Sequence, residues 1–131
     1  MYHYLHSASV LLRGHPTSVN CFGIYPEEPH KLVSGSYDTM IKLWDIRDKN
    51  CSATLKGHSQ QINSLSISPD GSLLLSGSED CTARLWDLRS GERPIYIATE
   101  HSGPILKVKF NPEDCMFATC SADRTAKYFR C

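Results

Sequence analysis

The sequence has 131 residues, and 14 lysines and arginines balance 14 aspartates and glutamates. This length fits one domain at most, and the balanced charge argues against a polybasic tail for nucleic acid or membranes and against an acidic solvating tail. No apolar run approaches the roughly 18 residues of a membrane span, and none forms the core of a signal peptide. We therefore expect a cytoplasmic protein that binds neither nucleic acid nor membranes.

The first landmarks along the chain are a Gly-His pair and an apolar pattern that follows it. Gly14-His15 comes first, then a run of small residues that ends in Asp38, then Trp44-Asp45. Short apolar runs separated by turn residues favour β-strands, and no stretch has helical spacing over three turns. Residues 8–13 resemble the strand that we predict at 94–99, so we expect a lone strand there. The apolar positions that follow Gly14-His15 are Val19, Phe22 and Ile24.

The same landmarks return one period later along the chain. His58 stands 43 residues after His15, and Ile62, Leu65 and Ile67 repeat the apolar positions in the same register. Agreement at several offsets indicates an internal repeat. The proline, aspartate and glycine of Ser68-Pro69-Asp70-Gly71 are typical of a turn. We predict four strands in this unit, at 62–67, 73–78, 82–86 and 94–99.

A third copy follows at the same spacing. His101 lies 43 residues after His58, and Ile105, Val108 and Phe110 take the apolar positions. In this copy Phe129-Arg130 replaces the Trp-Asp pair. We therefore divide residues 1–131, read as one partial domain, into units at 14–56, 57–99 and 100–131, and we expect the last unit to be incomplete.

The residues that could carry chemistry do not form a single reactive site. The six cysteines have no CxxC spacing, and without a secretory signal we expect ordinary thiols rather than disulfides. A zinc site needs two closely spaced pairs of ligands, and only His3 and His6 come close to one such pair. Serine, histidine and aspartate could suggest a hydrolase triad, but they recur at the same offsets in every unit, whereas catalysis needs one site. We expect no enzymatic activity, no catalytic residue, no metal and no cofactor.

The order of Gly-His, Ser-Pro-Asp-Gly, Ser-Gly-Ser-x-Asp and Leu-Trp-Asp resembles the WD repeat, which forms the blade of a β-propeller. The resemblance covers about residues 8–131. It implies an all-β fold with three blades' worth of strands, a partial propeller because rings close with about four to eight blades. It also implies a buried hydrogen-bonded tetrad in each blade, with Phe129 lacking the indole in the third. The implied residues are His15, Ser34, Asp38 and Trp44; His58, Ser76, Asp80 and Trp86; and His101, Thr119 and Asp123.

Several segments resemble the middle blades of the WD-repeat regulatory subunits of katanin. They are Gly35–Thr39, Ile41–Arg47, Gly57–Gln60, Ser68–Gly71, Ser102–Pro104 and Asp123–Thr125. The resemblance implies a non-catalytic scaffold in microtubule severing that associates with the cytoskeleton, with microtubules or tubulin and a katanin-type ATPase subunit as protein partners. That family has more blades and a C-terminal helical region, which this sequence lacks. Because much of the match is shared consensus, the alternative is a general adaptor in another complex, such as a ubiquitin ligase substrate adaptor or an RNA-processing scaffold.

By the same resemblance, partners are expected to bind the turns at the tetrad end of the blades. The candidates are Tyr37, Gln60 and Glu79. Tyr37 is favoured because aromatic residues are enriched in binding hot spots, although a tyrosine packed against the next blade fits the position equally well. A repeated basic position is either a stripe for acidic tubulin tails or a set of long side chains that lie over neighbouring strands. It holds Lys42, Arg84 and Lys127.

Overall fold

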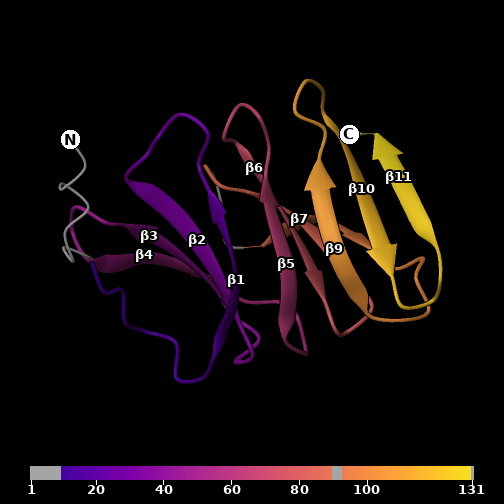
Figure 1. The fold of residues 1–131 in the computed structure, drawn as a ribbon, viewed down its shortest axis with the longest axis horizontal. Coiled ribbons are helices and arrows are strands. Elements are labelled where there is room, and N and C mark those ends of the chain that lie inside the picture. The colour runs from indigo at the N-terminus through magenta and orange to yellow at the C-terminus, as the bar shows by residue number, and fades with distance from the viewer. Residues whose placement is uncertain (1–9, 90–92, 131) are drawn as a thin grey trace, which may run out of the picture.

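The computed structural model describes residues 10–89 and 93–130, and their regular structure is β-strand only. The strands form three antiparallel sheets, which lie side by side in Figure 1. The first sheet contains β1 (Val19–Ile24), β2 (Lys31–Ser36), β3 (Ile41–Asp45) and β4 (Asn50–Leu55). The second contains β5 (Ile62–Ile67), β6 (Leu73–Ser78), β7 (Ala83–Asp87) and β8 (Pro94–Ala98). The third contains β9 (Ile105–Phe110), β10 (Met116–Ser121) and β11 (Ala126–Arg130).

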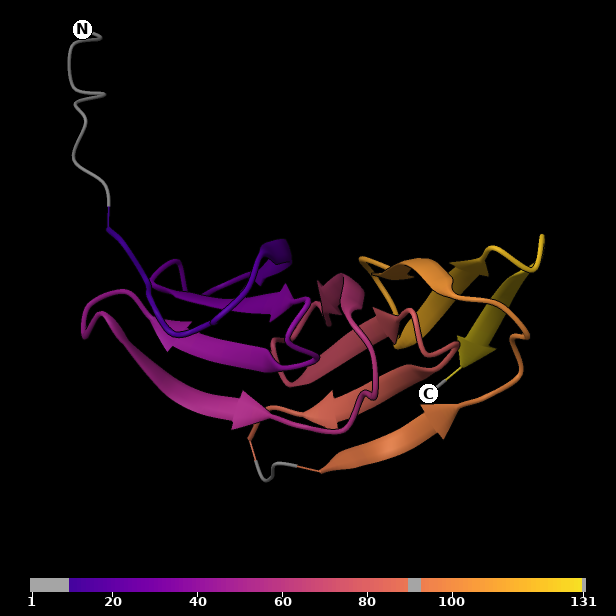
Figure 2. The ribbon, with the colours of Figure 1, turned by 90° about the horizontal axis from the view of Figure 1, so that it is seen from below.

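Each sheet is a meander, in which strands that follow one another in sequence are hydrogen-bonded neighbours. Successive sheets contact each other through their first strands, β1 with β5 and β5 with β9. Figure 2 shows the sheets following one another along the molecule, with β1–β4 at one end and β9–β11 at the other. This part of the chain holds no helix that is long and apolar enough to cross a membrane. The arrangement confirms the all-β prediction.

A tight turn after the second strand of each sheet has the same backbone conformation. One loop residue lies in the left-handed region, with φ of 73° at Thr39, 74° at Cys81 and 74° at Arg124. In the second sheet the amide of Cys81 donates to the carbonyl of Ser78 at 3.2 Å. Such three-residue loops combine a type I turn with one left-handed residue. The strand predicted at 82–86 corresponds to β7, which spans Ala83–Asp87.

Two apolar clusters lie between successive sheets. Ile62 on β5 and Ile105 on β9 are both 0% exposed, one in each cluster. Each packs against a glycine of the preceding sheet. A Cβ added at Gly35 would lie 2.7 Å from Ile62 Cγ2, and one added at Gly77 would lie 2.5 Å from Ile105 Cγ2. Glycine allows this close approach between sheets, so one repeat period corresponds to one sheet-to-sheet packing unit.

Two further expectations differ from the structure. Residues 10–13 of the expected lone strand at 8–13 are in no sheet, and residues 8 and 9 lie outside the described residues. A strand requires a hydrogen-bonded neighbour, and residues 10–13 pair with no described strand. The expectation of ordinary thiols is wrong for Cys115, which is disulfide-bonded; tertiary structure can bring together cysteines that no short spacing predicts. The free cysteines among the described residues are Cys21, Cys51, Cys81 and Cys120.

Candidate functional site

The second sheet holds a buried chain of four hydrogen-bonded side chains. His58 Nδ1 lies 2.9 Å from Asp80 Oδ2, and His58 Nε2 lies 2.7 Å from Ser76 Oγ. The indole N–H of Trp86 donates to the same serine oxygen at 2.9 Å. Ser76 lies on β6 and Trp86 on β7, and the turn between these strands carries Asp80. The hydrogen bonds therefore tie the loop before β5 to β6, to β7 and to the turn between these two strands.

The proton positions in this chain follow from what each group can donate. An indole nitrogen is a donor only, so Ser76 accepts from Trp86 and keeps its own proton for an acceptor, of which His58 Nε2 is the nearer at 2.7 Å and the Arg84 carbonyl the farther at 3.4 Å. Burial lowers the pKa of His58 more strongly than the carboxylate of Asp80 raises it, so the imidazole is neutral and donates its Nδ1 proton to Asp80. Burial opposes ionisation of Asp80, but hydrogen bonds from His58, from the Thr82 hydroxyl and from a backbone amide hold its pKa well below the usual range.

The first sheet brings together its four predicted residues in the same way. His15 Nδ1 lies 2.8 Å from Asp38 Oδ2, and His15 Nε2 lies 2.7 Å from Ser34 Oγ. The indole N–H of Trp44 donates to Ser34 Oγ at 2.8 Å. The other carboxylate oxygen of Asp38 accepts the backbone amide of Met40 at 2.8 Å. The side chains of His15 and Asp38 are only 3% and 8% exposed, so this chain is buried too.

The third sheet brings together the histidine, the hydroxyl and the aspartate, but it has no indole. His101 Nδ1 lies 2.9 Å from Asp123 Oδ2, and His101 Nε2 lies 2.8 Å from Thr119 Oγ1. Phe129 occupies the tryptophan position and stacks on Phe117, with ring centroids 5.0 Å apart. The phenylalanine therefore contributes packing at this position without a hydrogen-bond donor.

A serine hydroxyl in all three turns and a threonine hydroxyl in the second and third also hold these turns, and our sequence reasoning missed both. In the second unit Ser78 Oγ accepts the amide of Asp80 at 3.1 Å and donates to the Gln61 carbonyl at 2.7 Å. The Thr82 hydroxyl donates to Asp80 Oδ1 at 2.6 Å. The signal was the repeated Ser-x-Asp spacing, because serine and aspartate side chains close tight turns. The equivalents are Ser36 and Ser121 for the serine and Thr125 for the threonine.

Three comparisons with known proteins agree with this repeated geometry. The family model for the "WD domain, G-beta repeat" matches residues 6–45, 49–87 and 92–130. The chain belongs to the WD-repeat family. It is 36% identical over 104 residues to nuclear distribution protein PAC1 of Komagataella phaffii, covering 79% of this chain and 21% of that protein. It is 31% identical over 102 residues to target of rapamycin complex subunit wat1 of Schizosaccharomyces pombe, covering 78% of this chain and 32% of that protein.

Solved WD-repeat structures are similar to the fold as well. The WD40 repeats of RRP9 superpose with a TM-score of 0.85 at 25% identity, over 91% of this chain and 37% of that one. The structure of U3-55K superposes with a TM-score of 0.86 at 25% identity, over 91% of this chain and 38% of that one. These neighbours confirm the predicted fold class, blades of a partial WD-repeat propeller. The chain spans 21% of the length of the first curated relative named above and 32% of the length of the second.

The predicted partner-binding residues of this WD-repeat chain lie in turns at the tetrad end. Tyr37 is 53% exposed in the turn after β2, and Gln60 is exposed in the loop before β5. Glu79 is half-buried and accepts a hydrogen bond from Asn63 at 2.9 Å. Asn63 also donates to the carbonyl of Ile105 in the next blade at 2.9 Å. Glu79 therefore holds a side chain that also contacts the next blade, and Tyr37 and Gln60 are the more accessible candidates.

The repeated basic position lies next to the tetrads. Lys42 Nζ donates to Thr54 Oγ1 at 3.1 Å, and Arg84 Nε donates to Thr82 Oγ1 at 3.4 Å. Arg84 also lies against the loop before β5, since a Cβ added at Gly57 would come within 2.9 Å of its Nη1. These contacts favour long side chains lying over neighbouring strands rather than a free basic stripe.

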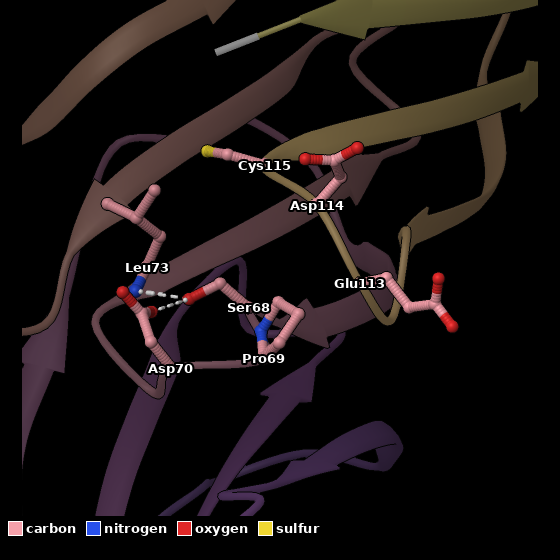
Figure 3. A pocket seen from close by; sticks show the side chains of 7 residues that line it. All are labelled: Ser68, Pro69, Asp70, Leu73, Glu113, Asp114 and Cys115. Carbon is pink, nitrogen blue, oxygen red and sulfur yellow. Dashed lines mark hydrogen bonds between the residues drawn. The ribbon is translucent and has the colours of Figure 1, made fainter.

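The opposite end of the sheets carries a cavity of about 230 Å³ between two turns. Figure 3 shows the turn of Ser68 and Asp70 on one side and the turn of Glu113 and Asp114 on the other. Asp70 stabilises its own turn by accepting hydrogen bonds from Ser72 and Ser68, and these bonds lower its pKa to about 2. Among the described residues, no group of three His, Cys, Asp or Glu side chains is placed to hold a metal ion. We read this cavity as a consequence of turn formation.

Proposed function

We propose that this chain is a non-catalytic scaffold that binds protein partners through its tetrad-end turns. The observation that carries the proposal is the exposure of Tyr37 on a turn whose backbone is fixed. The Ser36 hydroxyl accepts the amide of Asp38 at 3.1 Å and donates to the carbonyl of Ser18 at 2.7 Å. A fixed turn presents a rigid aromatic side chain that loses little entropy on binding.

The geometry of the tetrads supports the non-catalytic reading. A nucleophilic serine must be accessible to substrate and activated by a free base. Ser76 is instead 0% exposed, and its oxygen already accepts the indole proton of Trp86. The same arrangement of histidine, aspartate and hydroxyl recurs in each sheet, which is the pattern of a structural element rather than of one reactive site.

Within this role we favour a katanin-type regulatory subunit that directs a microtubule-severing ATPase. The support is the sequence resemblance in Gly35–Thr39, Gly57–Gln60 and Asp123–Thr125. These segments include the turn that carries Tyr37 and the loop that carries Gln60. One relative named above is a subunit of the target of rapamycin complex, so a general adaptor, in ubiquitin ligation or RNA processing for instance, is the competing function.

The test measures binding of the purified chain to microtubules by co-sedimentation and to a katanin ATPase subunit by pull-down. We expect the wild type to bind, and we expect Tyr37→Ala to weaken binding by more than about fivefold while the melting temperature stays unchanged. The matched control is Tyr96→Ala, because Tyr96 is 44% exposed on β8 rather than in a tetrad-end turn. Failure of the wild type to bind either partner would reject the katanin role and favour the general adaptor. Loss of both binding and stability in Tyr37→Ala would make Tyr37 a packing residue.

A further inference from the structure

The first sheet carries a surface cavity of about 410 Å³ at its tetrad end. The loop before β1 contributes Gly14 to one wall. The last two strands of the sheet form the other wall, where Lys42 lies on β3 and Thr54 on β4. Lys56, which directly follows β4, lines the cavity as well. Two lysine side chains and a hydroxyl group therefore share one cavity.

Neither of these lysines has a carboxylate partner. Among the described residues, no salt bridge includes Lys42 or Lys56. Lys42 Nζ donates to Thr54 Oγ1 at 3.1 Å, which holds the amine at the cavity and leaves two of its three protons available. Lys56 is exposed. Two positive charges that line one cavity repel each other, and a bound anion offsets that repulsion.

The pair of lysines belongs to the first unit and not to the repeat. In the second unit Arg84 takes the position of Lys42, and its Nε donates to Thr82 Oγ1 at 3.4 Å. Thr99 takes the position of Lys56, so the second unit has one cation where the first has two. The tetrad residues recur because the fold needs them in each unit. A feature that one unit adds to a shared fold is a candidate for binding.

The positions around the cavity stay accessible even where another sheet packs before them. The second unit shows this, because its β5 contacts β1 of the first sheet. There Ile97 takes the position of Thr54 and is 40% exposed, and Thr99 is exposed too. A preceding sheet leaves this part of a fourth strand open to solvent, so access to the cavity does not depend on where the chain begins.

The charges that line the cavity favour a carboxylate over a phosphate. Asp38 lines it together with the two lysines. The oxygens of Asp38 are already engaged, one with His15 Nδ1 at 2.8 Å and the other with the backbone amide of Met40 at 2.8 Å. Two lysines and one aspartate leave a single excess positive charge, which one carboxylate neutralises. A phosphate monoester carries nearly two negative charges at neutral pH and leaves the site with an excess of negative charge.

We propose that this cavity binds the side-chain carboxylate of an acidic residue on a protein partner. Lys42, held in place by Thr54, and the exposed Lys56 supply the positive charge. Tyr37, 53% exposed, directly precedes Asp38, so one turn presents both an aromatic surface and an edge of the cavity. The partner segment combines an acidic residue with a group that packs on Tyr37. This inference rests on the proposed function, because it names the chemistry of a partner that binds the tetrad-end turns.

The first experiment titrates the full chain with a fluorescent peptide of six glutamates at low ionic strength, where exposed charges interact most strongly. The matched peptide has six glutamines. We expect hexaglutamate to bind at least about tenfold more tightly than hexaglutamine. Backbone amide shifts in NMR spectra should change at Lys42 and Lys56 and stay constant at Asp70, at the opposite end of the sheets. Equal binding of the two peptides, or shifts at both ends, would overturn the proposal.

Charge-removing variants test the two lysines. Lys56→Gln and Lys42→Gln should each weaken hexaglutamate binding at least about threefold, as expected for the loss of one exposed charge pair. The matched control is Lys49→Gln, which removes the same charge from an exposed turn between β3 and β4, at the other end of β3, and should bind like the wild type. Equal losses in the three variants would indicate a general charge effect and reject the site. If Lys42→Gln melts at a lower temperature, Lys56→Gln decides, because that side chain is exposed.

Two further comparisons separate this site from other readings. A peptide with phosphoserine in place of one glutamate should bind no more tightly than hexaglutamate, and a gain of more than about tenfold would reject the carboxylate assignment. The microtubule and ATPase assays test the proposed function independently. Hexaglutamate binding that depends on Lys56 supports the site even if the wild type binds neither of those partners. If the wild type binds them and Lys56→Gln binds them equally well, the scaffold role stands and the cavity is not its contact.

Discussion

The second and third units share a fold but differ in one hydrogen-bond donor. In the second, Trp86 is 0% exposed and its indole donates to Ser76. In the third, Phe129 has no donor and lies half-buried beside a cavity of about 450 Å³. The histidine contacts are nevertheless within 0.1 Å of each other in length in the two units. The aspartate and histidine therefore reach their positions without the indole, which adds packing and one hydrogen bond.

If the aspartate is the element that both units need, its loss should have the largest effect. We expect Asp80→Ala to lower the free energy of unfolding by about 2–4 kcal/mol, because the buried donors of His58 and Thr82 lose their acceptor. Chemical denaturation followed by circular dichroism measures this loss. The control is Glu113→Ala in an exposed turn, which should cost less than about 0.5 kcal/mol. Equal losses in the two variants would contradict the central role of the aspartate.

Removing the donor from the second unit makes it resemble the third. We expect Trp86→Phe to lower the free energy of unfolding by about 1–3 kcal/mol, because the change leaves a small void and removes one buried hydrogen bond. Urea titration measures the change in midpoint, and the histidine contacts should survive it. The control is Trp86→Phe combined with Ser76→Ala, which also removes the acceptor. A Trp86→Phe variant as stable as the wild type would show that the donor is dispensable where it is present.

The neutral histidine of the second unit gives a pH dependence with a defined sign. Burial lowers the pKa of His58 in the folded state below its ordinary value of 6.5, so the unfolded chain binds an extra proton below that pH. Stability should then fall as the pH drops from 6.5 to the folded-state pKa. The pKa of Asp80 is also lowered, so a further loss follows at more acidic pH, below the usual aspartate range. Urea titrations from neutral to acidic pH measure both steps.

The control for the pH dependence is His58→Gln, which cannot titrate. The difference between the wild type and this variant should shrink as the pH falls from neutral toward the pKa of the folded histidine. A difference that is constant or grows over this interval would mean that the folded-state pKa of His58 is not lowered.

The repeat explains why most of the fold could be predicted from the sequence. Strands β5 and β6 have the predicted bounds, Ile62–Ile67 and Leu73–Ser78. Comparing three copies of one pattern identifies the apolar positions that all units share. The alternation of buried and exposed positions then sets the register. The same comparison could have found Ser78 and Thr82, since serine and threonine recur beside the aspartate.

Other features depended on contacts between elements that are distant in the sequence. The expected lone strand at 8–13 had a strand-like pattern, but forming a strand also needs a neighbour, and residues 10–13 pair with no described strand. Glu79 was predicted at an exposed turn, yet Asn63 of β5 reaches it across the sheet. The disulfide bond of Cys115 was not predicted from the sequence for the same reason. Such contacts follow from the packing of the whole molecule rather than from local propensity.

The smallest expected effect comes from giving the third unit the missing donor. We expect Phe129→Trp to raise the free energy of unfolding by up to about 1 kcal/mol, the net value of one intramolecular hydrogen bond. The new indole can donate to Thr119 Oγ1, as Trp44 and Trp86 donate to their serines at 2.8 and 2.9 Å. The adjacent cavity provides room for the larger ring, and the gain is limited because the stacking on Phe117 must adjust. The control is Tyr128→Trp, which adds an indole at a 58% exposed position of the same strand and should leave stability unchanged. Urea titration with tryptophan fluorescence measures both variants, and a loss of stability in Phe129→Trp alone would mean that the third unit is adapted to phenylalanine rather than merely lacking a donor.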